Sequence, residues 1–352
     1  MRLSRLDGIR ALAISLVLAH HTLGFDQGWF GVDVFFVLSG FLITGILRRD
    51  RNNKSFWAPF YIKRATRIIP PLILAFIGAS FVYTIAWRGV GLMYVFFAAN
   101  IAEAMHPAKG NPLGVLWSLA IEEHFYLVWP FAIRYLRRDQ LLRLLAIILI
   151  AGPLVRGLLT PFLNSYLPVY YLTPLRLDGL AAGSLLAILL EDETSTAWLR
   201  AWSGYLSLGL VLLLAAMFTQ PFFQREANSW SFNSLGYSLI AACCFFFLAF
   251  VYLHEDSKVS ALLSLSPVAF IGMISYGLYL FSPTVMVEMD RVGAALGYPH
   301  RHRLAPITFA LSILVSWLSY TFYEKPIMKW GHSKAHELNP KRLPQMTSVN
   351  PA

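Results

Sequence analysis

The side chains best suited to chemistry are an arginine and two adjacent histidines in an apolar stretch near the start of the chain. The stretch, residues 5–23, reads RLDGIRALAISLVLAHHTL. Arg10 and His21 lie eleven residues apart, which in a helix is close to three whole turns and about 16 Å along the axis. They therefore share one face, and Asp7 lies one turn from Arg10, a spacing that allows an ion pair. A neutral imidazole accepts a proton near neutral pH, so we expect His21 to act as a general base; a packing histidine with one interhelical hydrogen bond is the alternative.

A second candidate is the pair of carboxylates in the segment WSLAIEEHFYLVWP. Glu122 and Glu123 would point about 100° apart on a helix, so they cannot share one partner. We expect at least one of them to face the interior, and a carboxylate that meets an imidazole from another helix would fix the tautomer of that imidazole and raise its basicity. An ion pair between Glu122 and an arginine, with a purely structural role, is the alternative.

Two arginines in the segment FYIKRATRIIPP have the spacing of a phosphate clamp. Arg64 and Arg67 are i and i+3 on one predicted helical face, which suits them to bind a phosphate or pyrophosphate. Arginines at a membrane edge are also ordinary markers of the cytoplasmic side, or contacts of lipid headgroups.

Further polar side chains in apolar segments are candidate substrate contacts. Asp33 lies near the start of one predicted span, where a helix cap or a solvated residue is the alternative. Arg176 and Asp178 begin another span; two residues apart, they cannot pair across one helical face and are expected to reach different neighbours. Tyr276 and Ser282 are hydrogen-bond donors facing a cavity, or belong to an interfacial aromatic belt.

The composition predicts an all-α, polytopic membrane protein. Of 352 residues, 57% are hydrophobic and 14% charged, and the mean hydropathy is +0.56. That is more apolar surface than a soluble core of this size would bury. The net charge of +10 does not indicate nucleic-acid binding, because the basic residues gather beside the apolar runs. The two cysteines, Cys243 and Cys244, are adjacent in an apolar run, which argues against a disulfide framework and a metal site.

These helices are predicted to form a bundle of about ten transmembrane spans. The apolar candidates are residues 8–24, 28–47, 68–87, 89–105, 113–133, 141–159, 170–190, 203–219, 234–253, 265–287 and 305–324. Basic clusters precede and follow residues 89–105, and both can lie on the cytoplasmic side of the membrane only if this stretch does not cross it. Asn100 and Glu103 also interrupt the apolar character of the stretch. We therefore expect ten spans in a bacterial cytoplasmic (inner) membrane with both termini cytoplasmic, residues 1–330 as the membrane domain, and 331–352 as a disordered tail.

The order of these motifs resembles the membrane acyltransferase 3 family, O-acetylases that modify lipopolysaccharide and other exported glycans. The motifs are RLDGIRALA with His21, GVDVFFVLSGFLI, KRATRIIP, WSLAIEEHFYLVWP, RLDGLAAGSLLA, ISYGLYLF and YEKP, and they run from about residue 3 to 328. The resemblance implies transfer of an acyl group, usually acetyl from acetyl-CoA, to a sugar hydroxyl. The family's motif residues fall on Arg10, His21, Glu122, Arg64 and Arg67; Arg176 and Asp178 match a further signature.

Two positions depart from the family pattern. Ser282 stands where the family usually has a histidine, and His124 replaces a glutamine after the paired acids. Some relatives carry an additional periplasmic esterase-like domain after a further span. Because this sequence ends soon after the membrane domain, we expect the protein to act alone or with a separate partner.

The resulting hypothesis is an acyl-CoA-dependent O-acyltransferase without a metal. Acyl-CoA would enter from the cytoplasm and bind through Arg64, Arg67 and Arg10, and His21, oriented by Glu122, would activate a hydroxyl of a glycan or lipid-linked saccharide. A covalent acyl-histidine intermediate remains open. A proton-coupled transporter uses similar intramembrane charges, and a catalytically inactive relative that binds acyl-CoA or a glycan is a third possibility.

Overall fold

The computed structural model describes residues 3–85, 90–107, 110–297 and 301–338, and within these every regular element is helical. This confirms the all-α prediction. The α-helices are α1 (Ser4–Leu23), α2 (Gly31–Asp50), α3 (Trp57–Val82), α4 (Val90–Val95), α5 (Ala99–Met105), α6 (Leu116–Tyr135), α7 (Arg138–Leu159), α8 (Leu167–Tyr171), α9 (Leu177–Leu189), α10 (Glu193–Phe218), α11 (Tyr237–Leu253), α12 (Lys258–Leu263), α13 (Ser266–Met273), α14 (Ser275–Ala295), α15 (Arg301–Leu318) and α16 (Lys325–Glu337). Short 3-10 helices, η1 (Asp26–Phe30), η2 (Thr160–Phe162) and η3 (Thr173–Leu175), and π-helical turns, η4 (Phe232–Gly236) and η5 (Ser319–Glu324), complete them.

Six helical segments in the described residues are long and apolar enough to cross a membrane, or seven if the bent pair α13 and α14 counts as one span. The six are Asp26–Asp50, Trp57–Val82, Arg138–Phe162, Glu193–Phe218, Phe232–Leu253 and Leu304–Glu337. The bent pair has an angle of 68° between its two helices. The protein is therefore an integral membrane protein, but the predicted count of about ten spans is not confirmed.

Charge and helix length account for the difference. Helices α1 and α6 each have 20 residues, enough for about 30 Å, but each carries at least three charged side chains. The predicted span 170–190 is divided between α8, η3 and the 13-residue α9, which is too short to cross. The described part of the stretch 89–105, residues 90–105, forms the two short helices α4 and α5, and each is too short to cross, as expected.

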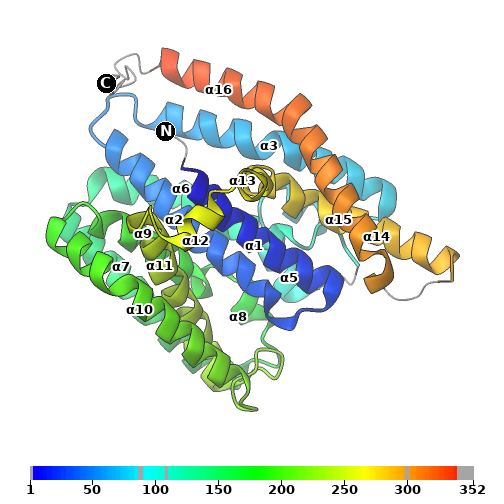
Figure 1. Ribbon diagram of the computed structural model, residues 1–352, viewed down its shortest axis with the longest axis horizontal. Helices are drawn as coiled ribbons and strands as arrows, with labels where there is room; N and C mark the ends of the chain where they lie inside the picture. Colours follow the sequence, from blue (N-terminus) through cyan, green and yellow to red (C-terminus); the bar gives the residue numbers. More distant parts are fainter. Residues whose placement is uncertain (1–2, 86–89, 108–109, 298–300, 339–352) are drawn as a thin grey trace.

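Helix backbones approach each other most closely at glycines, which have no side chain. Figure 1 shows α1 and α2 in the middle of the bundle, with α3 and α16 along one side and α7 and α10 along the other. A Cβ on Gly183 of α9 would lie 1.8 Å from the carbonyl oxygen of Val37 on α2, and one on Gly40 would lie 2.0 Å from that of Leu180. Gly31 and Gly40 of α2 thus lie at close helix contacts, whereas a Cβ on Gly45 would meet nothing within 4 Å.

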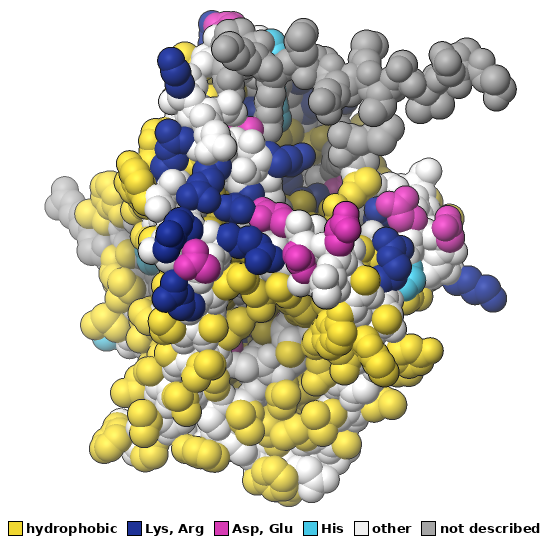
Figure 2. Space-filling model, turned by 90° about the vertical axis from the view of Figure 1, so that its left-hand side faces the viewer, with side chains coloured by type: hydrophobic (Ala, Val, Ile, Leu, Met, Phe, Trp, Pro, Cys, Tyr) yellow, Lys and Arg dark blue, Asp and Glu magenta, His cyan; other side chains and the backbone are white. Residues whose placement is uncertain are grey.

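One side of the bundle carries a band of charge. Helices α1 and α3 begin there, and α2 and α16 end there (Figure 1). Figure 2 shows lysine, arginine and acidic side chains gathered on this side, next to a wide hydrophobic surface. We call it the charged side.

The predicted disordered tail does not begin at residue 331. Helix α16 continues to Glu337 and packs against α3, where Gly331 lies against the side chain of Thr66. A Cβ on Gly331 would be 2.4 Å from the Thr66 hydroxyl oxygen. The remainder of the predicted tail, from residue 339, lies outside the described residues.

The contact between α2 and α9 gives a first prediction. The substitution Gly183→Ala forces the two backbones apart, and overpacking of this kind typically costs about 1–3 kcal/mol. We expect a lower melting temperature for the purified protein in detergent. The matched control is Gly209→Ala on α10, whose Cβ meets nothing within 4 Å and which should melt no lower than the wild type. Equal melting temperatures for the two variants would contradict the close packing of α2 and α9.

Candidate active site

A cavity of about 570 Å³ runs beside α2 and is also lined by α1, α3, α6, α14 and α16. Val32 and Ile46 both line it, and these residues lie fourteen positions apart on α2, or about 21 Å along the helix. Ser39 lies halfway, where its hydroxyl is hydrogen-bonded to that of Tyr126 on α6. The cavity is therefore long and narrow, with one end at Ile46 and the other at Val32.

A basic cluster faces this cavity, formed by Arg64 and Arg67 of α3 and His332 of α16. The Arg64 guanidinium lies 5.1 Å from the centre of the Tyr126 ring, within the range of a cation–π contact. Arg67 Nη1 lies 3.5 Å from Met328 Sδ. The structure thus brings the two predicted arginines to one cavity. It adds His332, which the prediction of a disordered tail had missed although the helix-compatible segment KPIMKWGHSKAHE contains it.

Glu122 and Arg10 also line the cavity, and Glu122 is its one carboxylate among the described residues. Arg10 donates to Asp7 at 2.5 Å, which confirms the ion pair predicted from their spacing. Glu122 lies one turn before Tyr126 on α6, so it faces the cavity close to its middle. The cavity therefore combines several cationic groups with one acid.

His21 does not line this cavity, and its side chain is exposed. It lies about 16 Å from Arg10 along α1, whereas Glu122 shares the cavity with Arg10. The structure therefore does not bring His21 and Glu122 together as expected. Helical periodicity predicts the face of the helix on which each residue lies, but it does not predict the axial register of α6 against α1.

The position of His21 is nevertheless close to the Val32 end of the cavity. A Cβ on Gly31, next to Val32, would lie 2.2 Å from the Ala13 carbonyl oxygen and 2.8 Å from the Val17 side chain. The start of α2 thus lies level with Ala13 and Val17 of α1. His21 comes about one helical turn after Val17, beyond that end of the cavity. The His20 ring packs beside it, with 5.1 Å between the ring centres.

Two buried ion pairs account for the polar residues at the start of α2 and α9. Arg176 pairs with Asp33 at 2.7 Å, and Asp178 pairs with Arg156 of α7 at 2.9 Å. All four side chains are at most 3% exposed. Arg176 and Asp178 therefore reach different neighbours, as their spacing predicted. None of the four lines the cavity, so a role of Asp33, Arg176 or Asp178 in substrate binding stays a prediction.

Sequence reasoning did not select Arg156, the partner of Asp178. A guanidinium within the apolar run 141–159 was the available signal, because a charge at such a position needs a partner inside the bundle. Arg156 also donates to the carbonyl oxygens of Asn233 and Leu175, each at 2.7 Å, and to Ser238 Oγ at 2.7 Å.

The remaining candidates divide between the cavity and the core. Tyr276 lines the cavity, and its hydroxyl donates to the Ile68 carbonyl oxygen at 3.1 Å. Tyr279 and Ser118, hydrogen-bonded at 2.7 Å, line it near the Val32 end, where Phe35 lies 6.4 Å from the Tyr279 ring. Ser282 is buried and does not line it.

His124, the second residue that departs from the family pattern, forms a hydrogen bond within the protein. Its Nδ1 lies 2.7 Å from the hydroxyl oxygen of Thr173, which also accepts from Asn100 at 3.0 Å. This contact joins α6 to η3 and α5.

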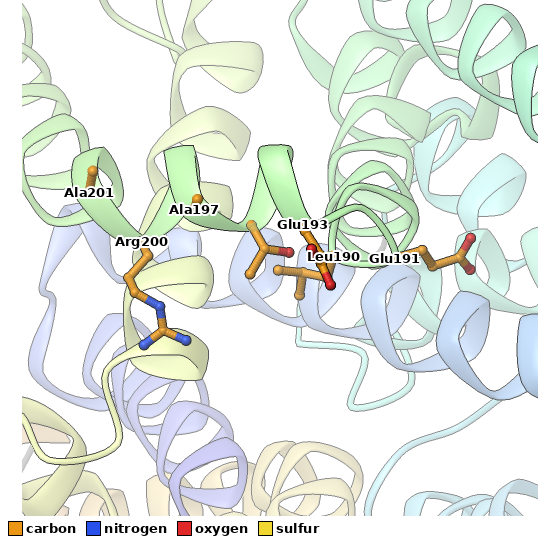
Figure 3. A pocket seen from close by; sticks show the side chains of 7 residues that line it. Leu190, Glu191, Glu193, Ala197, Arg200 and Ala201 are labelled. Atoms are coloured by element: carbon orange, nitrogen blue, oxygen red, sulfur yellow. The ribbon is translucent and has the colours of Figure 1, made fainter.

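Another cavity, also of about 570 Å³, lies between the end of α9 and the start of α10 (Figure 3). Glu191 and Arg200 point in different directions in this view. Each is already bound elsewhere, Glu191 to Arg48 at 2.6 Å and Arg200 to the Leu253 carbonyl oxygen at 2.7 Å. Without converging polar groups it is a weaker candidate than the cavity beside α2.

Comparison with known families matches residues 3–321 to the model of an acyltransferase domain. Among curated proteins, the chain is 31% identical to the peptidoglycan O-acetyltransferase OatA of Listeria monocytogenes, over 93% of this chain and 56% of that protein. It is 28% identical to the O-acetyltransferase OatA of Staphylococcus aureus, over 97% and 59% respectively. The putative peptidoglycan O-acetyltransferase YrhL of Bacillus subtilis is 29% identical, over 93% and 55%.

The chain thus spans between 55% and 59% of the length of these curated relatives. No solved structure matches it.

The buried ion pairs give a second prediction. Asp178→Asn leaves the Arg156 guanidinium buried without its countercharge, and breaking a buried pair in this way typically costs about 3–5 kcal/mol. We expect a large fall in melting temperature or in the yield of folded protein. The control is Asp139→Asn, which removes an exposed pair with Arg143 at 2.7 Å and should leave the melting temperature close to that of the wild type. Similar losses in both variants would show that burial of the Arg156 pair is not what matters.

Proposed function

Because this chain belongs to the acyltransferase 3 family, we propose that it is an integral-membrane O-acetyltransferase of a glycan, with acetyl-CoA as donor. The observation that carries the proposal is the cavity beside α2, with a basic cluster on its wall and His21 just beyond its Val32 end. The named activity of the relatives favours peptidoglycan over lipopolysaccharide as the type of acceptor.

The donor would enter at the Ile46 end. Helix α2 ends one turn after Ile46 in the sequence RRDR, on the charged side of the bundle, which the positive-inside rule assigns to the cytoplasm. In this orientation both the start of α1 and the end of α16 are cytoplasmic, and the membrane is the bacterial cytoplasmic membrane. CoA is a cytoplasmic metabolite, so the Ile46 end faces its source.

The basic cluster would bind the phosphates of CoA. Guanidinium groups form strong, charge-assisted hydrogen bonds with phosphate, and Arg64, Arg67 and His332 converge from two helices. Ser39, Tyr126 and Glu122 line the same cavity, with the Arg64 guanidinium over the Tyr126 ring, and they offer hydroxyl and carboxylate groups to the amides of the pantetheine arm. From Ser39 to Val32 the cavity continues for seven residues, about 10 Å, so the arm can carry the thioester toward the outer end.

His21 would act where the thioester meets the acceptor. The imidazole takes the proton of the glycan hydroxyl, the oxygen attacks the thioester carbonyl, and the C–S bond breaks as the tetrahedral intermediate collapses. The CoA thiolate leaves and receives the proton from the imidazolium, so the products are an O-acetyl ester and free CoA. The exposure of His21 gives a large polymeric acceptor access to this position.

The function is tested with purified protein in lipid vesicles, acetyl-CoA and muramic-acid-containing glycan fragments. We expect release of CoA thiol together with a mass gain of one acetyl group per modified hydroxyl. Proton-coupled uptake of a solute without thiol release would indicate the transporter instead. Thermal stabilisation by acetyl-CoA without turnover on any glycan would indicate an inactive relative.

The role of His21 gives a third prediction. His21→Ala should lower kcat by about 10²- to 10⁴-fold, the usual contribution of a positioned base, with an unchanged melting temperature. The matched control is His20→Ala, which removes the neighbouring imidazole, bound to the Phe25 carbonyl oxygen at 3.0 Å, and should retain activity within a few-fold. If His20→Ala is inactive and His21→Ala active, the base has been assigned to the wrong histidine.

The basic cluster gives a fourth prediction. Arg67→Gln should raise KM for acetyl-CoA by about 10- to 100-fold, since a hydrogen bond to a charged group contributes about 1.5–3 kcal/mol. The turnover number should change little, because phosphate contacts are the same before and during the reaction. His332→Gln should also raise KM, and Lys329→Gln, exposed on the same helix, serves as control. A fall in kcat at constant KM would place the cluster at the reacting atoms and not at the phosphates.

A further inference from the structure

A separate pocket of about 550 Å³ on the charged side is lined by Arg48, Arg51, Asn52 and Arg134. We propose that this arginine pocket binds the phosphate of an anionic membrane phospholipid, whose acyl chains lie along the exposed face of α6. The proposal concerns a site outside the cavity beside α2, and it does not depend on the acyl-transfer reaction.

Two of the three guanidinium groups of the pocket, those of Arg48 and Arg134, are held in place by neighbouring protein atoms. Arg48 donates to both carboxylate oxygens of Glu191, at 2.8 and 2.6 Å. Arg134 donates to the backbone carbonyl oxygens of Arg51 and Asn53, the latter at 3.4 Å, and its guanidinium lies 5.5 Å from the centre of the Phe56 ring. The pocket is thus preorganised by the loop between α2 and α3.

The pocket retains binding capacity for an anion. Its lining carries three guanidinium groups, and Glu191 is the carboxylate paired with one of them. Arg48 Nη1 is buried and has no hydrogen-bond partner among the described residues. A buried, unpaired donor of this kind is costly, and a phosphate oxygen would satisfy it.

The surroundings fit a lipid better than a soluble anion. Trp57 lies beside Phe131 and Tyr135, with ring centres 4.6 and 6.4 Å apart, and these two α6 residues are 50% and 69% exposed. Aromatic side chains of this kind are typical of the headgroup level of a membrane.

An apolar strip continues from these rings along α6. Leu127 and Val128 are 62% and 65% exposed, and Leu127 lies seven residues, about 10 Å, before Arg134 on the same face of the helix. A basic pocket at the cytoplasmic end of such a strip has the geometry of an anionic lipid site: phosphate on the arginines, hydrocarbon on the leucine and valine.

The test is native mass spectrometry of the purified protein in detergent with phosphatidylglycerol or phosphatidylcholine of identical acyl chains. We expect the wild type to retain phosphatidylglycerol preferentially. Arg51→Gln should weaken its binding about fivefold, the effect of one basic group near an anionic lipid, and leave phosphatidylcholine binding unchanged. Arg134→Gln should do the same; because Arg134 also holds the loop, Arg51→Gln is the decisive variant if Arg134→Gln does not fold.

The matched control is Arg143→Gln, which removes an exposed arginine of α7 outside the pocket and should leave phosphatidylglycerol binding at the wild-type level. Equal retention of the two lipids by the wild type, or an equal loss in Arg51→Gln and Arg143→Gln, would overturn the proposal. So would displacement of phosphatidylglycerol by millimolar inorganic phosphate, which would indicate a soluble anion. Weaker binding of CoA to Arg51→Gln, with lipid binding unaffected, would assign the pocket to the acyl donor.

Discussion

The cost of burying charge in an apolar bundle is the constraint on which this structure depends. A guanidinium in the interior must have a countercharge, and Arg156 and Arg176 obtain theirs from Asp178 and Asp33. These two pairs connect α7 to α9 and α9 to α2. Because the contacts of α2 with α9 also pass through Gly40 and Gly183, the position of α2 is fixed by close backbone packing as well as by charge.

A fixed α2 in turn defines the cavity. One face of the helix packs on α9, and another leaves a space that runs from Ile46 to Val32 against α1, α3, α6, α14 and α16. The charged residues that line this space differ from the buried ion pairs in how they are paired. Arg64, Arg67 and His332 converge on one volume, and none of the three forms an ion pair with a carboxylate of the described residues, an arrangement suited to an anionic ligand. The proposed donor site thus uses the same electrostatics as the core, with a ligand in place of the countercharge.

Sequence patterns predicted the features that follow from residue spacing within a single helix. The spacing of Asp7 and Arg10 gave their ion pair, and that of Arg176 and Asp178 gave their separate neighbours. The relation between helices was not accessible in this way. The register of α6 against α1 places Glu122 beside Arg10 and not beside His21, and the packing of Gly331 on Thr66 orders the helix that carries His332. The count of about ten spans is not confirmed for a similar reason, since hydropathy cannot show where an apolar run bends or breaks.

The central claim is that the acyl group of a bound donor reaches the Val32 end of the cavity, next to His21. The most direct measurement is photolabelling with a CoA thioester that carries a diazirine on its acyl group, followed by peptide mapping. The account predicts CoA-competable label on residues at that end, such as Val32, Phe35 or Tyr279. Label confined to the residues around Arg64 and Arg67, or to surfaces from which CoA does not displace it, would contradict the account.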